Sequence, residues 1–130
     1  MSNPSKQKGT AGETRVVKYL TALGIPAERR ALSGSQDKGD IKATSICPVP
    51  CEWTIEVKAG KQTWNPNRKQ IEEWLRQTRA EMKNSGCPGA LIILRYNRSI
   101  NDADVYVPRP TDESVRSHMW LDEFVDSCLR

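Results

Sequence analysis

Residues 52–59 read Glu-Trp-Thr-Ile-Glu-Val-Lys-Ala, and polar and apolar side chains alternate through the whole stretch. Alternation with a period of two predicts a β-strand, because successive side chains of a strand point to opposite faces of a sheet. The polar face of this strand would carry Glu56 and Lys58, roughly 6–7 Å apart along the chain. The stretch therefore predicts a strand that projects a carboxylate and an ammonium group into one space.

A second alternating stretch, residues 40–46, begins at Asp40 after a loop rich in glycine and serine. If the two strands pair as an antiparallel hairpin, Asp40 comes level with Glu56. Two carboxylates at such a short distance repel each other, and the repulsion raises the pKa of one of them unless a cation lies between them. The pair therefore predicts a site for a hard divalent ion, with Mg²⁺ the natural choice. The alternative is an ordinary solvated strand face, since Glu-x-Lys triplets are common.

Several short pieces stand in order in the first half of the chain: residues 8–13 (Lys-Gly-Thr-Ala-Gly-Glu), Arg29, residues 33–35 (Ser-Gly-Ser), Asp40-Ile41, and residues 55–58 (Ile-Glu-Val-Lys). Together they resemble the PD-(D/E)xK nuclease superfamily and, within it, the archaeal-type Holliday junction resolvases. The chain departs from that pattern at Thr14, where these resolvases usually carry Arg, and from Trp64 onward only the order of elements matches.

The resemblance implies a restriction-endonuclease-like core and a set of site residues. The implied catalytic residues are Glu13, Asp40, Glu56 and Lys58, and the supporting residues are Arg29 and Ser33. The three carboxylates would bind Mg²⁺, with Mn²⁺ as a substitute. Lys58 would orient or deprotonate the attacking water and stabilise charge on the phosphate.

Glu13 also has a structural interpretation. The first helix is expected from Thr10 to Leu23, and Glu13 lies on its inward, apolar stripe. Thr10-x-x-Glu13 fits a capping box, in which Glu13 would turn back to the Thr10 amide. Residues 1–9 are polar and basic, which predicts a flexible tail in front of a single nuclease domain, residues 10–130.

The remaining pattern predicts an α/β fold, a mixed central β-sheet flanked by helices. The expected order is helix, three strands, helix, two strands and helix. After the first helix, the expected elements are strands at 25–32, 40–46 and 52–59, a helix from Asn65-Pro66 to Gly86, a strand at 90–94, an edge strand at 105–107, and a helix that begins at Thr111.

Positive charge is concentrated outside the C-terminal segment. Residues 1–110 carry 18 Lys and Arg against 11 Asp and Glu, whereas residues 111–130 carry 2 against 5. A basic surface near clustered carboxylates suits a DNA substrate, because cations hold the phosphate backbone. Lys61 and Trp64, just beyond the site strand, and Gln70 on the following helix are candidate DNA contacts, although Trp64 could equally cover the core.

Composition restricts the class of protein. A length of 130 residues with 37% hydrophobic content predicts one soluble globular domain. The sequence has no apolar run of membrane-spanning length and no signal-peptide core, so an intracellular protein is expected, cytoplasmic or nucleoid-associated, with no membrane partner. Without a Gly-rich phosphate loop, no organic cofactor is expected. Cys47 and Cys51 have a spacing that zinc could use, but the two prolines between them favour a stiff hairpin tip.

The leading hypothesis is a Mg²⁺-dependent DNA endonuclease that resolves Holliday junctions in recombination and repair. Symmetrical cutting of a junction needs two active sites, which predicts a homodimer, with Trp120 and Phe124 of the C-terminal helix as interface anchors. The alternatives are a restriction-like, nicking or single-strand nuclease on the same core, or a DNA-binding module that does not cut.

Overall fold

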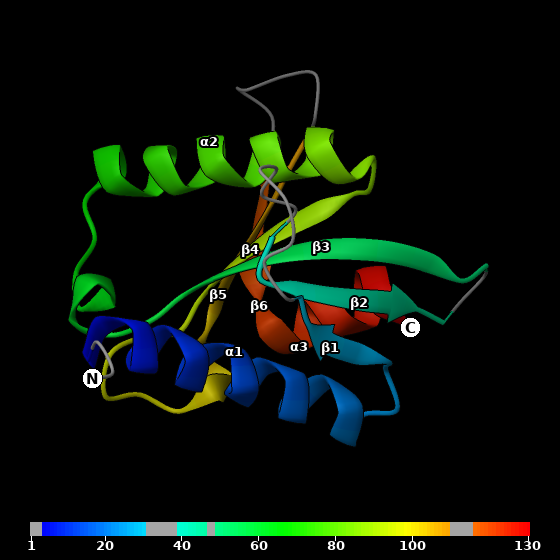
Figure 1. Cartoon of the computed structure of the whole chain (residues 1–130), viewed down its shortest axis with the longest axis horizontal. Helices are drawn as coiled ribbons and strands as arrows, with labels where there is room; N and C mark the ends of the chain where they lie inside the picture. The colour runs from blue at the N-terminus through cyan, green and yellow to red at the C-terminus, as the bar shows by residue number, and fades with distance from the viewer. Residues whose placement is uncertain (1–3, 31–38, 47–48, 110–115) are drawn as a thin grey trace.

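A computed structural model describes residues 4–30, 39–46, 49–109 and 116–130, with only the backbone for residues 4–10. It shows one six-stranded sheet in the order β1-β2-β3-β4-β5-β6 (Figure 1). The helices and strands are α1 (Pro4–Ala22), β1 (Ala27–Arg29), β2 (Ile41–Ser45), β3 (Cys51–Lys58), α2 (Arg68–Ser85), β4 (Gly89–Ile93), β5 (Asp104–Pro108), β6 (Arg116–Trp120) and α3 (Leu121–Phe124). Only β3 and β4 pair in parallel, so the sheet is mixed, as predicted.

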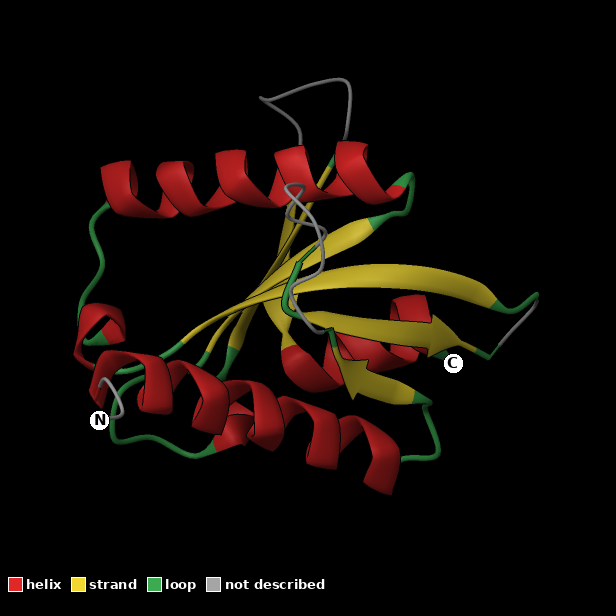
Figure 2. Cartoon of the chain, viewed as in Figure 1, coloured by secondary structure: helices red, strands yellow, loops and turns green. Residues whose placement is uncertain are grey.

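Helices cover both faces of this sheet (Figure 2). On one face, α1, α3 and the π-helical turn Val125–Leu129 close the main hydrophobic core around Ile55 and Val57 of β3. On the other face, Trp74 and Leu75 of α2 pack against β4. Since β3 contacts both layers, two of its polar residues are buried too, Thr54 at 0% and Glu56 at 3% exposure. The alternative of an ordinary solvated face is therefore wrong for Glu56, which lies on an interior face beneath α2.

The two long helices begin at positions that differ from the predicted ones. Helix α1 starts at Pro4, so residues 4–9 are helical and Thr10 lies inside the helix. The capping box proposed for Thr10 and Glu13 is wrong, because an N-cap residue must stand at the helix start. Helix α2 starts after Asn67, whose side chain accepts a hydrogen bond from the Gln70 N–H at 2.9 Å. The cap is therefore Asn67 and not Asn65, and the helix ends at Gly86 as expected.

The C-terminal segment differs most from the prediction. Residues 116–120 form the strand β6, which pairs with β5, so β5 is not an edge strand and the last helix starts only at Leu121. Apolar residues in this segment fit both a helical and an extended pattern, and tertiary pairing decided between them. The predicted Thr111 cap lies outside the described residues. The first strand, Ala27–Arg29, is shorter than the predicted 25–32.

This change of structure buries one of the two proposed interface anchors. Phe124 has 0% exposure and meets Trp53 of β3 edge-on, with ring centroids 5.5 Å apart. Its side chain is therefore part of the core and is not free to contact another subunit. Trp120 remains 46% exposed. In the described part of the chain, no helix is long and apolar enough to cross a membrane.

Phe124→Ala should lower the free energy of unfolding by about 3–5 kcal/mol, the range for truncating a buried aromatic side chain. Urea denaturation followed by circular dichroism measures this loss. Trp120→Ala is the matched control, and because the Trp120 ring is half-exposed, its cost should be clearly smaller. Equal losses for the two variants would contradict the burial of Phe124.

Candidate active site

The β2–β3 hairpin brings Asp40 beside Glu56. Ile41 pairs with Ile55, and the Asp40 N–H donates to the Ile55 carbonyl at 3.0 Å, so Asp40 stands level with Glu56, as the sequence predicted. The Asp40 carboxylate then accepts a hydrogen bond from the Val57 N–H at 2.9 Å. This bond from the neighbouring strand fixes the orientation of the Asp40 side chain.

Gly39 makes this approach possible. Its φ is +101°, a conformation that side-chain-bearing residues rarely adopt, and a Cβ at this position would lie 2.3 Å from the Thr54 hydroxyl oxygen. The chain can therefore enter β2 against β3 only with glycine at this position. Gly39 thus has a steric role that places Asp40 beside β3.

The surroundings of Asp40 favour its protonated form. Burial, followed by the negative charge of Glu56, raises the pKa of Asp40 to about 8, although the hydrogen bond from the Val57 N–H opposes this shift. The charge of Glu13 adds to the same upward shift, which places Glu13 close to the pair. The site therefore holds negative charge that the described residues compensate only in part.

Glu56 and Lys58 form an ion pair beneath α2. The Lys58 Nζ lies 3.1 Å from Glu56 Oε1 and donates a hydrogen bond to Gln77 Oε1 at 2.9 Å. The second oxygen, Glu56 Oε2, is buried and, while Asp40 is ionised, has no hydrogen-bond donor among the described residues. A protonated Asp40 can donate to Glu56, which is one reason for its raised pKa. A buried carboxylate oxygen without a donor is costly, and a bound cation would remove that cost.

Glu13 reaches this region from the opposite layer. A Cβ on Gly12 would lie 2.8 Å from the Ala59 Cβ, so glycine lets α1 pack directly against the end of β3. Glu13 Oε2 accepts a hydrogen bond from Arg29 Nε at 2.9 Å. Arg30 points the other way and contacts Glu52 at 3.4 Å. The structure therefore places Arg29, and not Arg30, beside the implied catalytic residues.

The predicted DNA contacts lie at different distances from this cluster. Lys61 is exposed and begins the short helical turn Lys61–Thr63 shortly after β3. Trp64 is 72% exposed and meets Tyr96 edge-on, so it does not cover the core. Gln70 is exposed in the first turn of α2, seven residues before Gln77 and therefore about 10 Å away along the helix. Ser33 lies outside the described residues.

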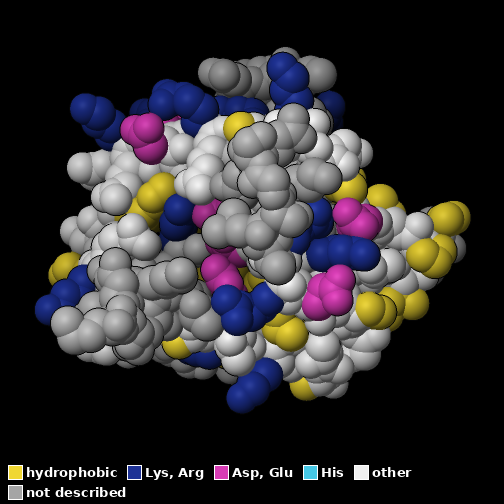
Figure 3. Space-filling view, viewed as in Figure 1, with side chains coloured by type: hydrophobic (Ala, Val, Ile, Leu, Met, Phe, Trp, Pro, Cys, Tyr) yellow, Lys and Arg dark blue, Asp and Glu magenta, His cyan; other side chains and the backbone are white. Residues whose placement is uncertain are grey.

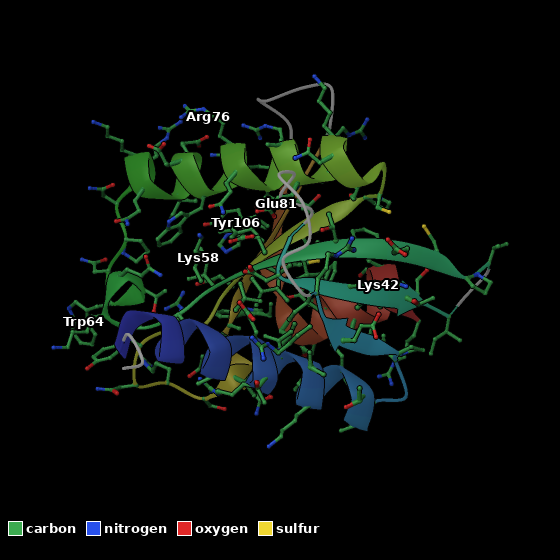
Figure 4. The ribbon with its side chains drawn as sticks, viewed as in Figure 1. Lys42, Lys58, Trp64, Arg76, Glu81 and Tyr106 are labelled. Atoms are coloured by element: carbon green, nitrogen blue, oxygen red, sulfur yellow. The ribbon has the colours of Figure 1, made fainter. Side chains whose placement is uncertain are left out.

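Helix α2 contributes two residues that the sequence analysis missed. Gln77 contacts Lys58, and Glu81 is 1% exposed near the same layer. Figure 4 shows Lys58 and Glu81 in the space between α2 and the sheet. Glu81 stands seven residues after Trp74, on the apolar stripe of its helix. A carboxylate on the apolar stripe of a helix marks Glu13 in the sequence, and the same pattern marks Glu81.

The carboxylates fit a divalent cation. Within residues 4–30, 39–46, 49–109 and 116–130, no three His, Cys, Asp or Glu side chains are already arranged as metal ligands. Asp40 and Glu56, however, supply closely spaced hard oxygen atoms, one of them without a donor, in a site of excess negative charge. Figure 3 shows acidic and basic side chains side by side at the centre of this face, between α1 and α2.

The cysteines give no further support to a zinc site. Cys51, Cys87 and Cys128 are free thiols, and Cys47 lies outside the described residues. Cys51 is exposed, whereas Cys87 and Cys128 are half-buried. The Cys87 thiol is 3.4 Å from the Glu52 carboxylate, away from the Asp40 and Glu56 pair.

Comparison with known proteins agrees with this geometry. A family model described as "Phage putative PDDEXK endonuclease" matches residues 4–121. Among solved structures, the chain is similar to Hjc from Archaeoglobus fulgidus, a Holliday junction resolvase from an archaeal hyperthermophile, with 17% identity and a TM-score of 0.50. That match covers 88% of this chain and 89% of the other, and it shows a shared fold. No curated protein matches this sequence.

The raised pKa of Asp40 predicts that the metal-free protein loses stability as the pH rises from about 4 to about 8. The unfolded chain has an Asp pKa of 3.8, and the folded chain has one of about 8. The folded state therefore binds the extra proton throughout this range, and its advantage is lost as the pH approaches 8.

Asp40→Asn removes this titration while its amide oxygen can still accept from the Val57 N–H. Melting temperatures measured in EDTA should therefore fall less steeply with pH for Asp40→Asn than for the wild type, and the variant should melt higher at pH 8. Mg²⁺ should raise the melting temperature of the wild type at pH 8 and have little effect on the variant. Parallel pH curves for the two proteins would contradict this account of Asp40.

Proposed function

The chain belongs to the phage PD-(D/E)xK endonuclease family, and on that premise we propose that it is a Mg²⁺-dependent enzyme that hydrolyses phosphodiester bonds of branched DNA. The observation that carries this proposal is the buried pair of Asp40 and Glu56. Burial and then the charge of Glu56 raise the pKa of Asp40, and one Glu56 oxygen has no donor when Asp40 is ionised. A module that only binds DNA has no need for such a pair, because it costs stability.

In this proposal, Asp40 and Glu56 hold the metal, and Glu13 is the third carboxylate ligand. The bound ion would supply Lewis acidity and would neutralise charge on the phosphate oxygens. Mn²⁺ should replace Mg²⁺, since both accept carboxylate oxygen ligands. Glu13 is paired with Arg29 in this structure, so it must exchange that partner in order to bind a metal.

Lys58 is the proposed charge-stabilising and water-orienting residue. Its ammonium group is only 17% exposed and is held between Glu56 and Gln77. A donor fixed in advance, in a site from which water is largely excluded, stabilises developing negative charge better than a mobile one. Gln77 is a positioning residue in this scheme, because it acts through Lys58. Arg29, Lys61 and Gln70 would contact the phosphate backbone.

The proposed substrate is a four-way junction. The ordered motif in the first half of the chain resembles that of junction resolvases, and the fold is shared with one such enzyme. Resolution needs two coordinated cuts, so we also propose a homodimer with two-fold symmetry. With Phe124 in the core, the available aromatic anchor on the C-terminal segment is Trp120, at the end of β6.

Asp40→Asn should abolish cleavage of a radiolabelled junction while DNA affinity changes little, because it removes a metal ligand and not a phosphate contact. Glu13→Gln should also slow cleavage severely, and Ca²⁺ should permit binding without turnover. Single-turnover gel assays on a junction, a linear duplex and a single strand, each with Mg²⁺, Ca²⁺ or EDTA, measure these effects.

Glu73→Gln provides a matched control for these substitutions, because Glu73 is an exposed carboxylate on α2 that pairs only with Arg76 among the described residues. It should cut at the wild-type rate. Full activity of Asp40→Asn would remove Asp40 from the site. Equal rates on all three DNA forms would support a general nuclease in place of a resolvase.

Trp120→Glu should convert a dimer into a monomer and uncouple the two cuts on a junction. A stable interface buries on the order of 800 Å² per partner around a few anchors, and a charge at an aromatic anchor removes much of that energy. Sedimentation velocity at micromolar concentration, with and without junction DNA, measures the assembly. Val49→Glu is the control, since it places the same charge on another exposed apolar residue, one that is assigned no DNA contact. A wild-type protein that stays monomeric with junction DNA would refute the resolvase proposal.

A further inference from the structure

A polar cavity lies on the α2 side of the sheet, next to the carboxylate cluster but separate from it. Its volume is about 200 Å³. Strands β4, β5 and β6 form its floor, and the turn after β3 together with the start of α2 forms its wall. The residues on which the argument depends are Trp64, Asn65, Arg95, Asp104, Tyr106 and His118.

The sheet register places this cavity level with Lys58. Lys58 pairs with Ile93, Ile93 pairs with Asp104, and residues paired in this way point to the same face of a sheet. Asp104 is therefore two strands from Lys58, or about 10 Å at the usual strand spacing. Stacked nucleotides rise about 3.4 Å each along one strand, so a strand cut at Lys58 passes the cavity within about three nucleotides.

The polar groups of the cavity are held in place without a ligand. Asp104, 14% exposed, accepts hydrogen bonds from Arg95 at 2.9 and 3.2 Å and lies 3.0 Å from His118 Nε2. The His118 ring stacks on Tyr106, with centroids 4.2 Å apart and an interplanar angle of 3°. Arg95 and His118 remain 42% and 52% exposed, so both keep hydrogen-bonding groups that a ligand can reach.

We propose that this cavity binds a single unstacked nucleobase of the DNA strand that is being cut. The proposal rests on the proposed function for the identity of the ligand as DNA. Trp64 and the stacked pair of His118 and Tyr106 provide aromatic surface, which binds bases of any sequence. Arg95 and Asn65 provide hydrogen-bonding groups for the edge of a base.

Size and charge both favour a base over other parts of DNA. A cavity of about 150 Å³ can bind benzene, so 200 Å³ suits one aromatic ring system and is too small for a base pair. A phosphate is a poor fit, because the Asp104 carboxylate in the cavity lining already takes up the charge of Arg95. The cavity therefore complements a flat, neutral, polar ring.

This assignment explains how the protein would select its DNA. Removing a base from a duplex stack costs a few kcal/mol, and the cost is smallest where the base is already unpaired or mismatched. A cavity that must be filled by a base close to the cut therefore favours junction centres, bulges and flaps over continuous duplex. Selection of branched DNA would then come from β4, β5 and β6, and not from the carboxylates.

The test is a double-mutant cycle that combines a substitution in the protein with removal of one base from the DNA. A set of junctions is prepared in which each junction carries a single abasic site, and the site is moved through the four positions on either side of the cut. Their affinities are measured by fluorescence anisotropy for Asp40→Asn and for the same protein with His118→Ala, in Ca²⁺ to prevent cleavage. At one position within about three nucleotides of the cut, His118→Ala should weaken binding of the intact junction about fivefold or more and leave the abasic junction unchanged. The cycle cancels the cost of unstacking, because both proteins bind the same DNA.

Lys61→Ala in the same Asp40→Asn background is the matched control. It removes an exposed cation beside the cavity and should weaken intact and abasic junctions equally, as expected for a phosphate contact. A second variant, Trp64→Ala, should repeat the position-specific result of His118→Ala. Thermal melts confirm that each variant is folded.

The outcomes separate this inference from the proposed function. If the wild type cuts junctions but His118→Ala and Trp64→Ala weaken all DNA equally or not at all, the base cavity is refuted and the nuclease remains. If a position-specific effect is found without cleavage by the wild type, the cavity is supported and the nuclease proposal fails. If no junction is bound, both are refuted.

Discussion

The repulsion between Asp40 and Glu56 is the constraint on which the rest of the structure depends. Both carboxylates lie on the interior face of the β2–β3 hairpin, where burial and their mutual charge raise the pKa of Asp40 to about 8. The protein tolerates this cost because the same hairpin buries Ile41 and Ile55 completely on its other face. Apolar packing of Ile41 and Ile55 on one face of the hairpin thus offsets the repulsion between Asp40 and Glu56 on the other face.

Several local features serve this one arrangement. Gly39 lets the chain enter β2 against Thr54, and Gly12 lets α1 reach the end of β3. Helix α2 covers the charged face and supplies Gln77, which holds Lys58. The glycines act through steric fit and Gln77 through hydrogen bonding, so none of the three needs to touch the substrate. Their common effect is that the carboxylates and the ammonium group are positioned before DNA arrives.

The sequence was most informative where a local pattern and the final packing agree. The alternation in residues 52–59 predicted β3, and the level pairing of Asp40 with Glu56 followed from it. It was least informative for residues 116–120, because a short segment with mixed apolar residues fits a helix or a strand, and only the ladder with β5 decides. Gln77 and the cavity were missed for a related reason. Packing of α2 on the sheet brings Gln77 to Lys58, and register across several strands brings the cavity residues together.

The two groups of candidate functional residues lie on different halves of the sheet. Arg29 of β1, Asp40 just before β2, and Glu56 and Lys58 of β3 are the residues to which the proposed reaction is assigned. Asp104 of β5, His118 of β6 and Arg95, just after β4, form the second group. The sheet register places Asp104 level with Lys58 and His118 level with Glu56, but these residues take no part in the carboxylate cluster. Because the parallel pairing of β3 with β4 fixes the distance between the halves, the position of a bound base would determine which phosphate lies at Lys58. Substrate selection can then change in the second half while the chemistry of the first half stays the same.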